Sequence, residues 1–211
     1  MTESTKKANG QESYYVWFDS EYSSLELGSA CLLQVAAMIT DTSLRRLGPA
    51  EQDIRLAIQL PRNQILSPWV EENLPDLVGA CRSSQAVSLK EADARLAAYV
   101  DSFIGPPAEK ESKRPVLAGN SVHADWWLAL RDLPLFLGRL HYRHLDVTSL
   151  KLEWQRRYPD REFNKEDPQL VARYFSEAYL AKGETRHDAY YDIQASIAEL
   201  SFYRSHLLRP E

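Results

Sequence analysis

The chain has 211 residues, of which 44% are hydrophobic and 26% are charged, and its formal net charge is −5 at pH 7. This composition is typical of a globular protein and disfavours one that coats long nucleic acid non-specifically, because such binding depends on excess basic residues. The apolar runs are shorter than the roughly 18 residues that cross a membrane, and the polar start MTESTKKANGQESY does not resemble a signal peptide, so we expect a soluble, cytoplasmic protein without membrane contact.

Three N-terminal segments have strand patterns. An aromatic and β-branched run covers Tyr14–Asp19, an apolar run covers Ala30–Thr40, and apolar and polar residues alternate over Ile54–Leu60. The short connections between them predict an antiparallel meander. Residues 1–12 are predicted to form a disordered tail. The two cysteines, Cys31 and Cys81, lie in apolar surroundings and are expected to be free thiols.

The rest of the chain alternates between helix and strand patterns. Ser67 followed by Pro68 marks a helix start, and Ser88 with Glu91 predicts a capping box for a helix that ends at Phe103. The other predicted segments are helices over Ala124–Leu137, Thr148–Arg157, Asp167–Leu180 and His187–Leu207, and strands over residues 116–120 and Leu145–Val147. Strands first, and then strands alternating with helices, predict an α/β fold with a mixed sheet in one domain, residues 13–211.

Acidic residues and a histidine occur where predicted elements begin or end. Asp19 and Glu21 lie two apart at the end of the first strand, so both side chains face one side. Asp125 follows the strand at 116–120, and His187 and Asp192 open the last predicted helix. Each feature alone is more often structural, as a solvated turn, a helix cap or a first-turn acid. Their joint occurrence indicates a shared site.

Four carboxylates without a cysteine cluster form an oxygen-rich site that suits Mg²⁺ or Mn²⁺ rather than Zn²⁺. Two such ions about 4 Å apart can clamp a phosphodiester, one beside the attacking water and one beside the leaving 3′-oxygen. A histidine, whose ordinary pKa is about 6.5, suits the base that takes the proton from that water. The pattern therefore predicts two-metal phosphodiester hydrolysis.

The order D-x-E, then D, then H-x₄-D resembles the DEDDh 3′→5′ exonuclease superfamily. The segments VWFDSEYSSL, LLQVAAMITD, LAGNSVHAD, LHYRHLDVTSLKLEWQRRYP and HDAYYDIQASIAELSFYRSHL resemble its oligoribonuclease family over most of residues 14–208, and HYRHLDVTSLK is the most specific of them. The resemblance implies an RNase H-like mixed β-sheet flanked by α-helices. It implies a homodimer that hydrolyses short single-stranded RNA or dinucleotides to 5′-mononucleotides with two Mg²⁺ or Mn²⁺ ions.

The resemblance also implies roles for single residues. Asp19, Glu21, Asp125 and Asp192 would hold the metal pair, with His187 as the general base. The positions that match substrate contacts are Leu25 as a wedge between bases, Trp69 as a stacking platform, Ser121, Arg143 and Thr148 around the 5′-phosphate, and Tyr142 from the other subunit of the dimer. Without the resemblance, Leu25 and Trp69 are equally explained as core, Tyr142 as packing, and Arg143 as a surface cation.

The sequence departs from the family pattern at several places. Ser23-Ser24 replaces Thr-Gly, Gln34 replaces a glutamate, and the histidine expected shortly after Trp69 is absent. Tryptophans 126 and 127 stand where the family carries charged residues, as core or as part of an altered substrate wall. The stretch Phe163–Arg186 is longer than usual and is predicted to contain an extra helix before His187.

These departures leave two alternatives to a short-RNA exonuclease. One is a DEDDh exonuclease that acts on longer single-stranded RNA or on DNA, for which the Ser23-Ser24 change and the Phe163–Arg186 insertion argue. The other is a catalytically silent relative that binds RNA or protein. It is disfavoured because all five catalytic positions are filled.

Overall fold

The computed structural model describes residues 13–180 and 187–207, so the predicted N-terminal tail lies outside the described residues. The strands are β1 (Tyr14–Tyr22), β2 (Leu32–Asp41), β3 (Ile54–Ala57), β4 (Val116–Gly119) and β5 (His144–Asp146). The α-helices are α1 (Pro68–Asn73), α2 (Pro75–Cys81), α3 (Leu89–Ile104), α4 (Val122–Asp132), α5 (Pro134–Leu137), α6 (Val147–Arg157), α7 (Pro168–Tyr174) and α8 (Ala189–Leu207). Two short 3₁₀ helices are η1 (Ala50–Gln52) and η2 (Glu111–Lys113).

The strands of the described residues form one mixed sheet in the order β3-β2-β1-β4-β5. The first three strands pair antiparallel, because short connections return the chain directly to its neighbour. β4 pairs parallel with β1, and β5 pairs parallel with β4, since helices intervene between these strands. The predicted antiparallel meander and the mixed sheet are both confirmed.

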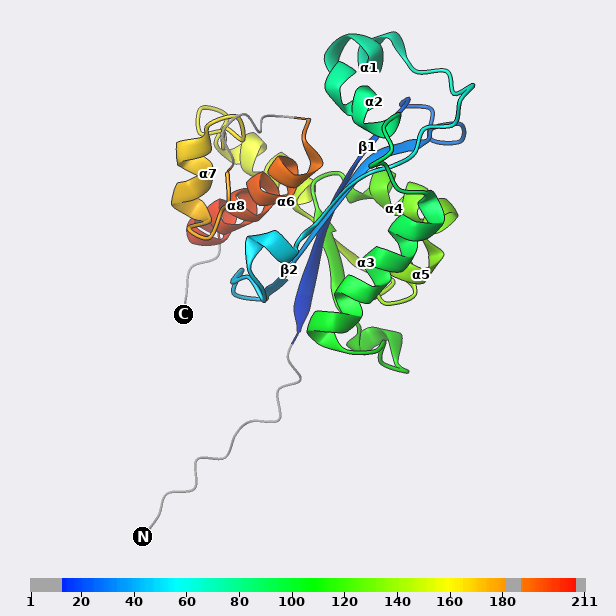
Figure 1. Cartoon of the computed structure of the whole chain (residues 1–211). Helices are drawn as coiled ribbons and strands as arrows, with labels where there is room; N and C mark the ends of the chain where they lie inside the picture. The colour runs from blue at the N-terminus through cyan, green and yellow to red at the C-terminus, as the bar shows by residue number, and fades with distance from the viewer. Residues whose placement is uncertain (1–12, 181–186, 208–211) are drawn as a thin grey trace.

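Helices cover both faces of this sheet. Helices α3, α4 and α5 lie on one face, and α6, α7 and α8 lie on the other (Figure 1). Alternation along β1 supplies both cores, because successive strand residues point to opposite faces. Val16 and Phe18 belong to the core beneath α3 and α4, whereas Trp17 belongs to the core beneath α8. Asp19 and Glu21, which follow in β1, are therefore held in position by a strand that is buried on both faces.

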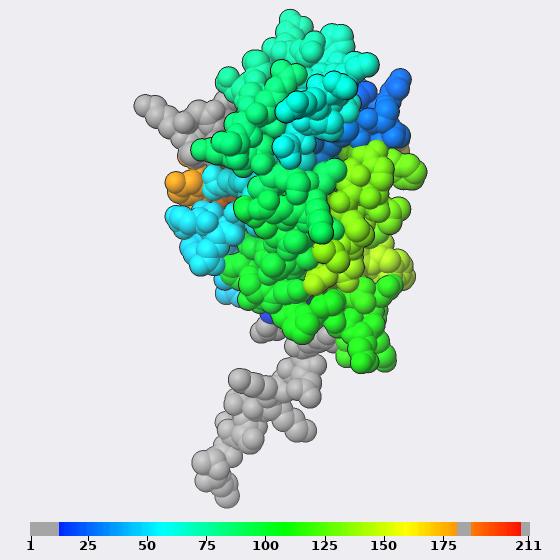
Figure 2. Space-filling view, turned by 45° about the vertical axis from the view of Figure 1, so that its right-hand side comes forward, coloured from blue at the N-terminus to red at the C-terminus, as the bar shows by residue number. Residues whose placement is uncertain are grey.

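Helices α1 and α2 form a separate small layer at one end of the sheet (Figure 1). Its core contains Leu33 from β2 and Cys81 from α2. Figure 2 shows this layer above the green surface of α3. Helix α1 begins as predicted, with Val70 donating its backbone N–H to the Ser67 hydroxyl at 3.3 Å and Pro68 at the first helical position. Cys31 and Cys81 are free, as predicted.

Several predicted helices have different bounds in the structure. The helix predicted over Ala124–Leu137 starts at Val122 and is two helices, because Pro134 lacks an N–H and disfavours helical geometry at Leu133. The helix predicted over Asp167–Leu180 ends at Tyr174. Only half of the predicted capping box is present: the Ser88 hydroxyl accepts from the backbone N–H of Glu91, whereas the Glu91 carboxylate pairs with Arg95.

The last helix begins at Ala189, so the prediction that His187 lies inside it is wrong. The Asp188 carboxylate accepts from the backbone N–H groups of Tyr190 and Tyr191, both at 3.0 Å, and so caps the helix immediately before Ala189. His187 has φ +69° and lies in the turn that precedes the cap. No helix within the described ranges combines the length and the apolar character that a bilayer crossing needs.

Candidate active site

The carboxyl end of β1 places two of the predicted acids. Asp19 and Glu21 alternate with Ser20 along the strand, so both carboxylates lie on the side of α8. The parallel neighbour β4 ends beside them at Gly119, where a Cβ atom would lie 2.9 Å from the backbone oxygen of Phe18. Glycine at this position therefore allows the two strands to approach closely next to Asp19.

Asp192 comes to the same place from α8. Oxygen atoms of Asp19, Glu21 and Asp192 all lie within 4.8 Å of one another. Asp192 is the fourth residue of α8, and only 9% of it is exposed. The packing of α8 against β1 thus joins residues that are more than 170 positions apart in the chain into one acidic cluster.

Asp125 completes the set from the other side of the sheet. It lies in the first turn of α4, is buried, and accepts a hydrogen bond of 2.6 Å from the Ser20 hydroxyl. All four acids line one cavity of about 940 Å³. The structure therefore brings the four predicted carboxylates together.

Crowding and burial disfavour the ionised forms of these acids. Burial, and then the charges of Asp125 and Asp192, raise the pKa of Asp19 well above its usual value. Burial, and then Asp192, raise the pKa of Glu21 to about 8. Burial raises the pKa of Asp125 to about 7, although the hydrogen bond from Ser20 acts in the opposite direction.

This donor set fits divalent cations. Carboxylate oxygens are the ligands that Mg²⁺ and Mn²⁺ prefer. The oxygens of Asp19, Glu21 and Asp192 are close enough to share an ion, and added positive charge would relieve the repulsion that raises their pKa values. The cluster is thus consistent with metal-dependent chemistry.

His187 lies at the edge of the same cavity. Its backbone N–H donates to Oδ2 of Asp192 at 3.1 Å, which ties the turn to the acidic cluster. Its ring meets Trp69 edge to face, with 4.9 Å between ring centroids. The turn thus places His187 in the wall of the cavity, with its ring against Trp69, which also lines it.

Sequence comparison with curated proteins decides the family. Over 206 residues, the chain is 31% identical to the oligoribonuclease of Streptomyces coelicolor, and the alignment covers 93% of this chain and 88% of that protein. The chain belongs to the oligoribonuclease family. It is also 35% identical over 197 residues to the probable oligoribonuclease of Schizosaccharomyces pombe, which covers 92% of this chain and 68% of that protein. A scan against protein-family models found no match.

Solved structures share the fold of this oligoribonuclease-family chain at lower identity. Exonuclease I of Methylocaldum szegediense superposes with a TM-score of 0.62 at 18% identity, over 92% of this chain and 41% of that one. An E. coli exonuclease I–ssDNA complex has a TM-score of 0.66 at 16% identity, over 94% and 42% of the two chains. The chain therefore spans about two-fifths of these exonucleases, and the likeness confirms the RNase H-like fold.

The two predicted base contacts of this family member are exposed rather than core. Leu25 is 87% exposed and Trp69 is 47% exposed, and both line the cavity. Their interpretation as ordinary core is wrong. At the Ser23-Ser24 change, the buried Ser23 hydroxyl accepts from the backbone N–H of Cys31 at 2.9 Å and so joins the two ends of the loop between β1 and β2.

Of the residues predicted to bind the 5′-phosphate, Ser121 lines the cavity. Thr148 does not line it, but its hydroxyl, near the start of α6, lies 3.2 Å from the Ser121 hydroxyl at the start of α4. Arg143 and Tyr142 do not line the cavity of a single chain; the guanidinium lies 5.3 Å from the Tyr142 ring on an exposed surface. Their predicted roles thus depend on a second copy of the chain.

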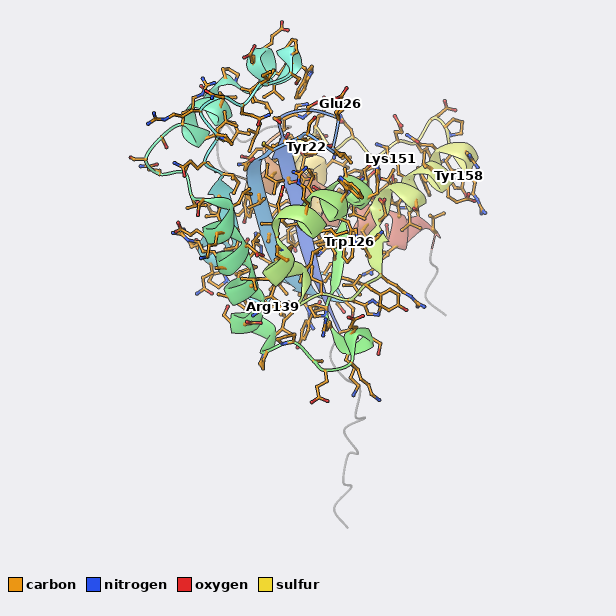
Figure 3. All side chains as sticks on the ribbon, turned by 90° about the vertical axis from the view of Figure 1, so that its right-hand side faces the viewer. Tyr22, Glu26, Trp126, Arg139, Lys151 and Tyr158 are labelled. Carbon is orange, nitrogen blue, oxygen red and sulfur yellow. The ribbon has the colours of Figure 1, made fainter. Side chains whose placement is uncertain are left out.

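The tryptophans after Asp125 do not form a substrate wall. Trp126 packs partly against the core and against His144, and Trp127 is 51% exposed outside the cavity. In Figure 3, Tyr22 and Lys151, which line the cavity, lie at one end of the sheet, whereas Trp126 lies farther along it.

Gln34, which replaces a family glutamate, has a structural explanation. It lies opposite Glu21 in the β1–β2 ladder. Its side chain donates to Asp188 at 3.1 Å and accepts from the backbone N–H of Ala189 at 3.0 Å, so it anchors the start of α8 to the sheet. A carboxylate at position 34 would face the Asp188 carboxylate, whereas the amide satisfies both partners.

The extra segment before His187 contributes a residue that the sequence analysis did not identify. The predicted extra helix is present as α7, while residues 181–186 lie outside the described residues. Ahead of α7, Lys165 lines the cavity and its Nζ lies 3.0 Å from Oδ1 of Asp192. Burial opposes its charge, but Asp192 and Asp19 raise the pKa of Lys165 above its usual value. No spacing rule connects Lys165 to the acids, since the contact depends on how the segment folds back.

Proposed function

We propose that this oligoribonuclease-family chain is a 3′→5′ exoribonuclease that hydrolyses very short RNAs, including dinucleotides, to 5′-mononucleotides. The observation that carries the proposal is the shared cavity of four carboxylates, bordered by His187 and by the exposed side chains of Leu25 and Trp69. The enzyme class follows from family membership. The residue roles below are proposals built on this geometry.

Asp19, Glu21, Asp125 and Asp192 would hold two Mg²⁺ or Mn²⁺ ions. When bound, the ions would activate the attacking water and stabilise the leaving 3′-oxygen. Asp125 keeps its orientation through the Ser20 hydroxyl, and Asp192 through the His187 backbone N–H. These two hydrogen bonds limit rotation of the Asp125 and Asp192 carboxylates, which supports a site that is ordered before substrate binds.

His187 is proposed as the general base that accepts the proton of the attacking water. The hydrogen bond from its backbone N–H to Asp192 and the edge-to-face contact of its ring with Trp69 support this role, because both partners line the cavity that holds the acids. A base must lie within hydrogen-bond reach of the proton that it accepts. Replacement of His187 by Ala should therefore lower kcat far more than it raises KM.

Leu25 and Trp69 are proposed to hold the terminal bases without reading their sequence. An exposed aromatic ring can stack on any base, and an exposed leucine can contact the apolar face of any base, and both residues line the cavity. The adjacent hydroxyls of Ser121 and Thr148 are proposed to bind the 5′-phosphate. A phosphate contact at a fixed distance from the acids would favour substrates about two nucleotides long.

We further propose a homodimer in the cytoplasm in which Tyr142 and Arg143 of one subunit reach the cavity of the other. Both residues are exposed and lie outside the cavity of their own chain. Arg143 would then supply a planar fork for phosphate oxygens. Analytical ultracentrifugation of the wild type and of Tyr142→Ala tests the assembly, and a wild-type monomer at enzymatic concentration would contradict it.

The central test is hydrolysis of a dinucleotide with and without Mn²⁺. Asp192→Asn should abolish hydrolysis while the circular dichroism spectrum remains that of the wild type, because one metal-binding oxygen is lost. Asp76→Asn, an exposed acid in α2 outside the cavity, is the matched control and should retain wild-type rates. Full activity in Asp192→Asn, or activity in EDTA, would refute the proposed site.

A second candidate is a DEDDh exonuclease that prefers longer single strands. The observation in its favour is the wall formed by residues 163–166, which belong to the extended segment and line the cavity. One of the structural neighbours is a complex with ssDNA. Initial rates on a dinucleotide, a pentamer and an RNA or DNA of about 20 nucleotides distinguish the candidates. A silent binding relative would hydrolyse none of them and would lack a tight Mn²⁺ site.

A further inference from the structure

Lys165 occupies a position in the acidic cavity that the metal-ligand pattern does not explain. Its Nζ lies 3.0 Å from Oδ1 of Asp192, and its side chain is 27% exposed. Oδ2 of the same carboxylate accepts from the backbone N–H of His187. Both oxygens of Asp192 therefore already have partners, and the partner on Oδ1 is a cation.

The backbone at Lys165 is held firmly by the folded core. The carbonyl oxygen of Lys165 accepts a hydrogen bond of 2.7 Å from the Tyr191 hydroxyl, one residue before Asp192 in α8. Two residues earlier, Phe163 is buried in the core beneath α8. The indole of Trp154 donates to the carbonyl oxygen of Arg161. The segment thus delivers its lysine to the cavity from a fixed anchor.

The lysine side chain can change partner without moving that anchor. Lysine carries a compact charge on a flexible four-carbon stem, so the ammonium can shift by several ångströms while the backbone stays in place. A divalent ion shared by Asp19, Glu21 and Asp192 would compete with the ammonium for the Asp192 carboxylate, since two cations that share one carboxylate repel each other. The displaced ammonium would remain inside the cavity, where an RNA phosphate is the available anion.

We propose that Lys165 neutralises Asp192 in the metal-free site and, once metal replaces it, donates to a phosphate oxygen of the bound RNA. This role rests on the proposed function, because it assumes a phosphodiester substrate in the cavity. Its two halves make opposite predictions for one variant. Loss of the ammonium should strengthen metal binding and weaken RNA binding.

Calorimetric titration of Mn²⁺ into EDTA-stripped full-length protein tests the first half. Lys165→Met should bind Mn²⁺ roughly two- to tenfold more tightly than the wild type, because no internal cation competes. Lys151→Met is the matched control: Lys151 lines the same cavity from α6, and no ion pair with a carboxylate is seen for it among the described residues. Equal or weaker Mn²⁺ binding in Lys165→Met would overturn the competition.

Titration of a 5′-phosphorylated diadenylate in Ca²⁺ tests the second half without relying on hydrolysis. Lys165→Met should weaken binding roughly 10- to 100-fold, the range for a hydrogen bond between charged groups, and Lys165→Arg should recover most of it. Unchanged diadenylate binding in Lys165→Met would overturn the phosphate contact. If Lys165→Met does not fold, Lys165→Gln is measured in its place with the same expected directions.

The same data separate this inference from the proposed function. A wild-type protein that binds no diadenylate refutes the proposed substrate, whereas the Mn²⁺ titration still tests the competition at Asp192. A wild-type protein that binds and hydrolyses diadenylate, with a Lys165→Met variant indistinguishable in both titrations, refutes only the role of the lysine.

Discussion

Replacement of Trp69 by alanine tests whether an exposed aromatic ring in α1 holds the RNA. Trp69 is 47% exposed, lines the cavity and contacts the His187 ring at 4.9 Å. Loss of a stacking side chain costs about 1–3 kcal/mol per base, which corresponds to a decrease in kcat/KM of roughly 5- to 150-fold. Since about half of this residue is already exposed, the free energy of unfolding should fall by about 2 kcal/mol or less, below the cost for a buried tryptophan.

Trp127→Ala is the matched control for this prediction. Trp127 is 51% exposed, nearly the same as Trp69, but it lies in α4 outside the cavity. Urea unfolding should therefore show comparable losses for both variants, while only Trp69→Ala loses kcat/KM on a dinucleotide at saturating Mn²⁺. Trp69→Phe keeps a ring and should stay within about fivefold of the wild type. Equal kcat/KM losses for Trp69→Ala and Trp127→Ala, or none for Trp69→Ala, would refute the stacking role.

Two further predictions follow from the packing and protonation of the site. In EDTA, the free energy of unfolding should fall as pH rises from about 5 to about 9. Folding raises the pKa of Asp125 to about 7 and that of Glu21 to about 8. The folded state therefore retains protons that the unfolded chain releases near pH 4. Urea titrations across this range measure the slope, which saturating Mn²⁺ should reduce, and a pH-independent stability in EDTA would contradict the cited shifts. Gly119→Ala should destabilise the fold by about 1–3 kcal/mol and lower kcat through Asp19, because its Cβ would lie 2.9 Å from a backbone oxygen of β1. Gly79→Ala in α2 is the control, because no atom lies within 4 Å of the new Cβ. Equal unfolding free energies for the two variants would contradict the prediction, since β1 and β4 could then separate without loss of stability.

Local sequence patterns were sufficient for most of the fold. Alternation of apolar residues, Ser-Pro and Ser-x-x-Glu starts and the order of strands and helices predicted the mixed sheet and the main helices. Element ends were less certain, since they depend on single residues. Pro134 separates α4 from α5, and the Asp188 cap starts α8 after His187. The seven-residue helix α2 was not predicted, because its short apolar pattern lies directly behind Pro75.

The acids of the site were predictable because each lies at the end of a strand or near the start of a helix that the sequence pattern identifies. Two residues of one strand share a side by geometry alone, so Asp19 and Glu21 required no tertiary information. Asp125, His187 and Asp192 are each more often structural, and their joint occurrence and the resemblance to oligoribonucleases joined them to the first two as one set. The cavity that the four acids share agrees with that set.

What the sequence by itself determined is therefore which residues carry the proposed chemistry and which class of fold presents them. Only the tertiary structure decided their partners: Ser20 with Asp125, 105 positions apart, Gln34 with Asp188, and Lys165 with Asp192. The physical reason is that periodicity describes one element at a time. Contacts between elements depend on how strands and helices pack, and the lysine in the acidic cavity follows from the anchoring of its segment by Phe163 and Tyr191.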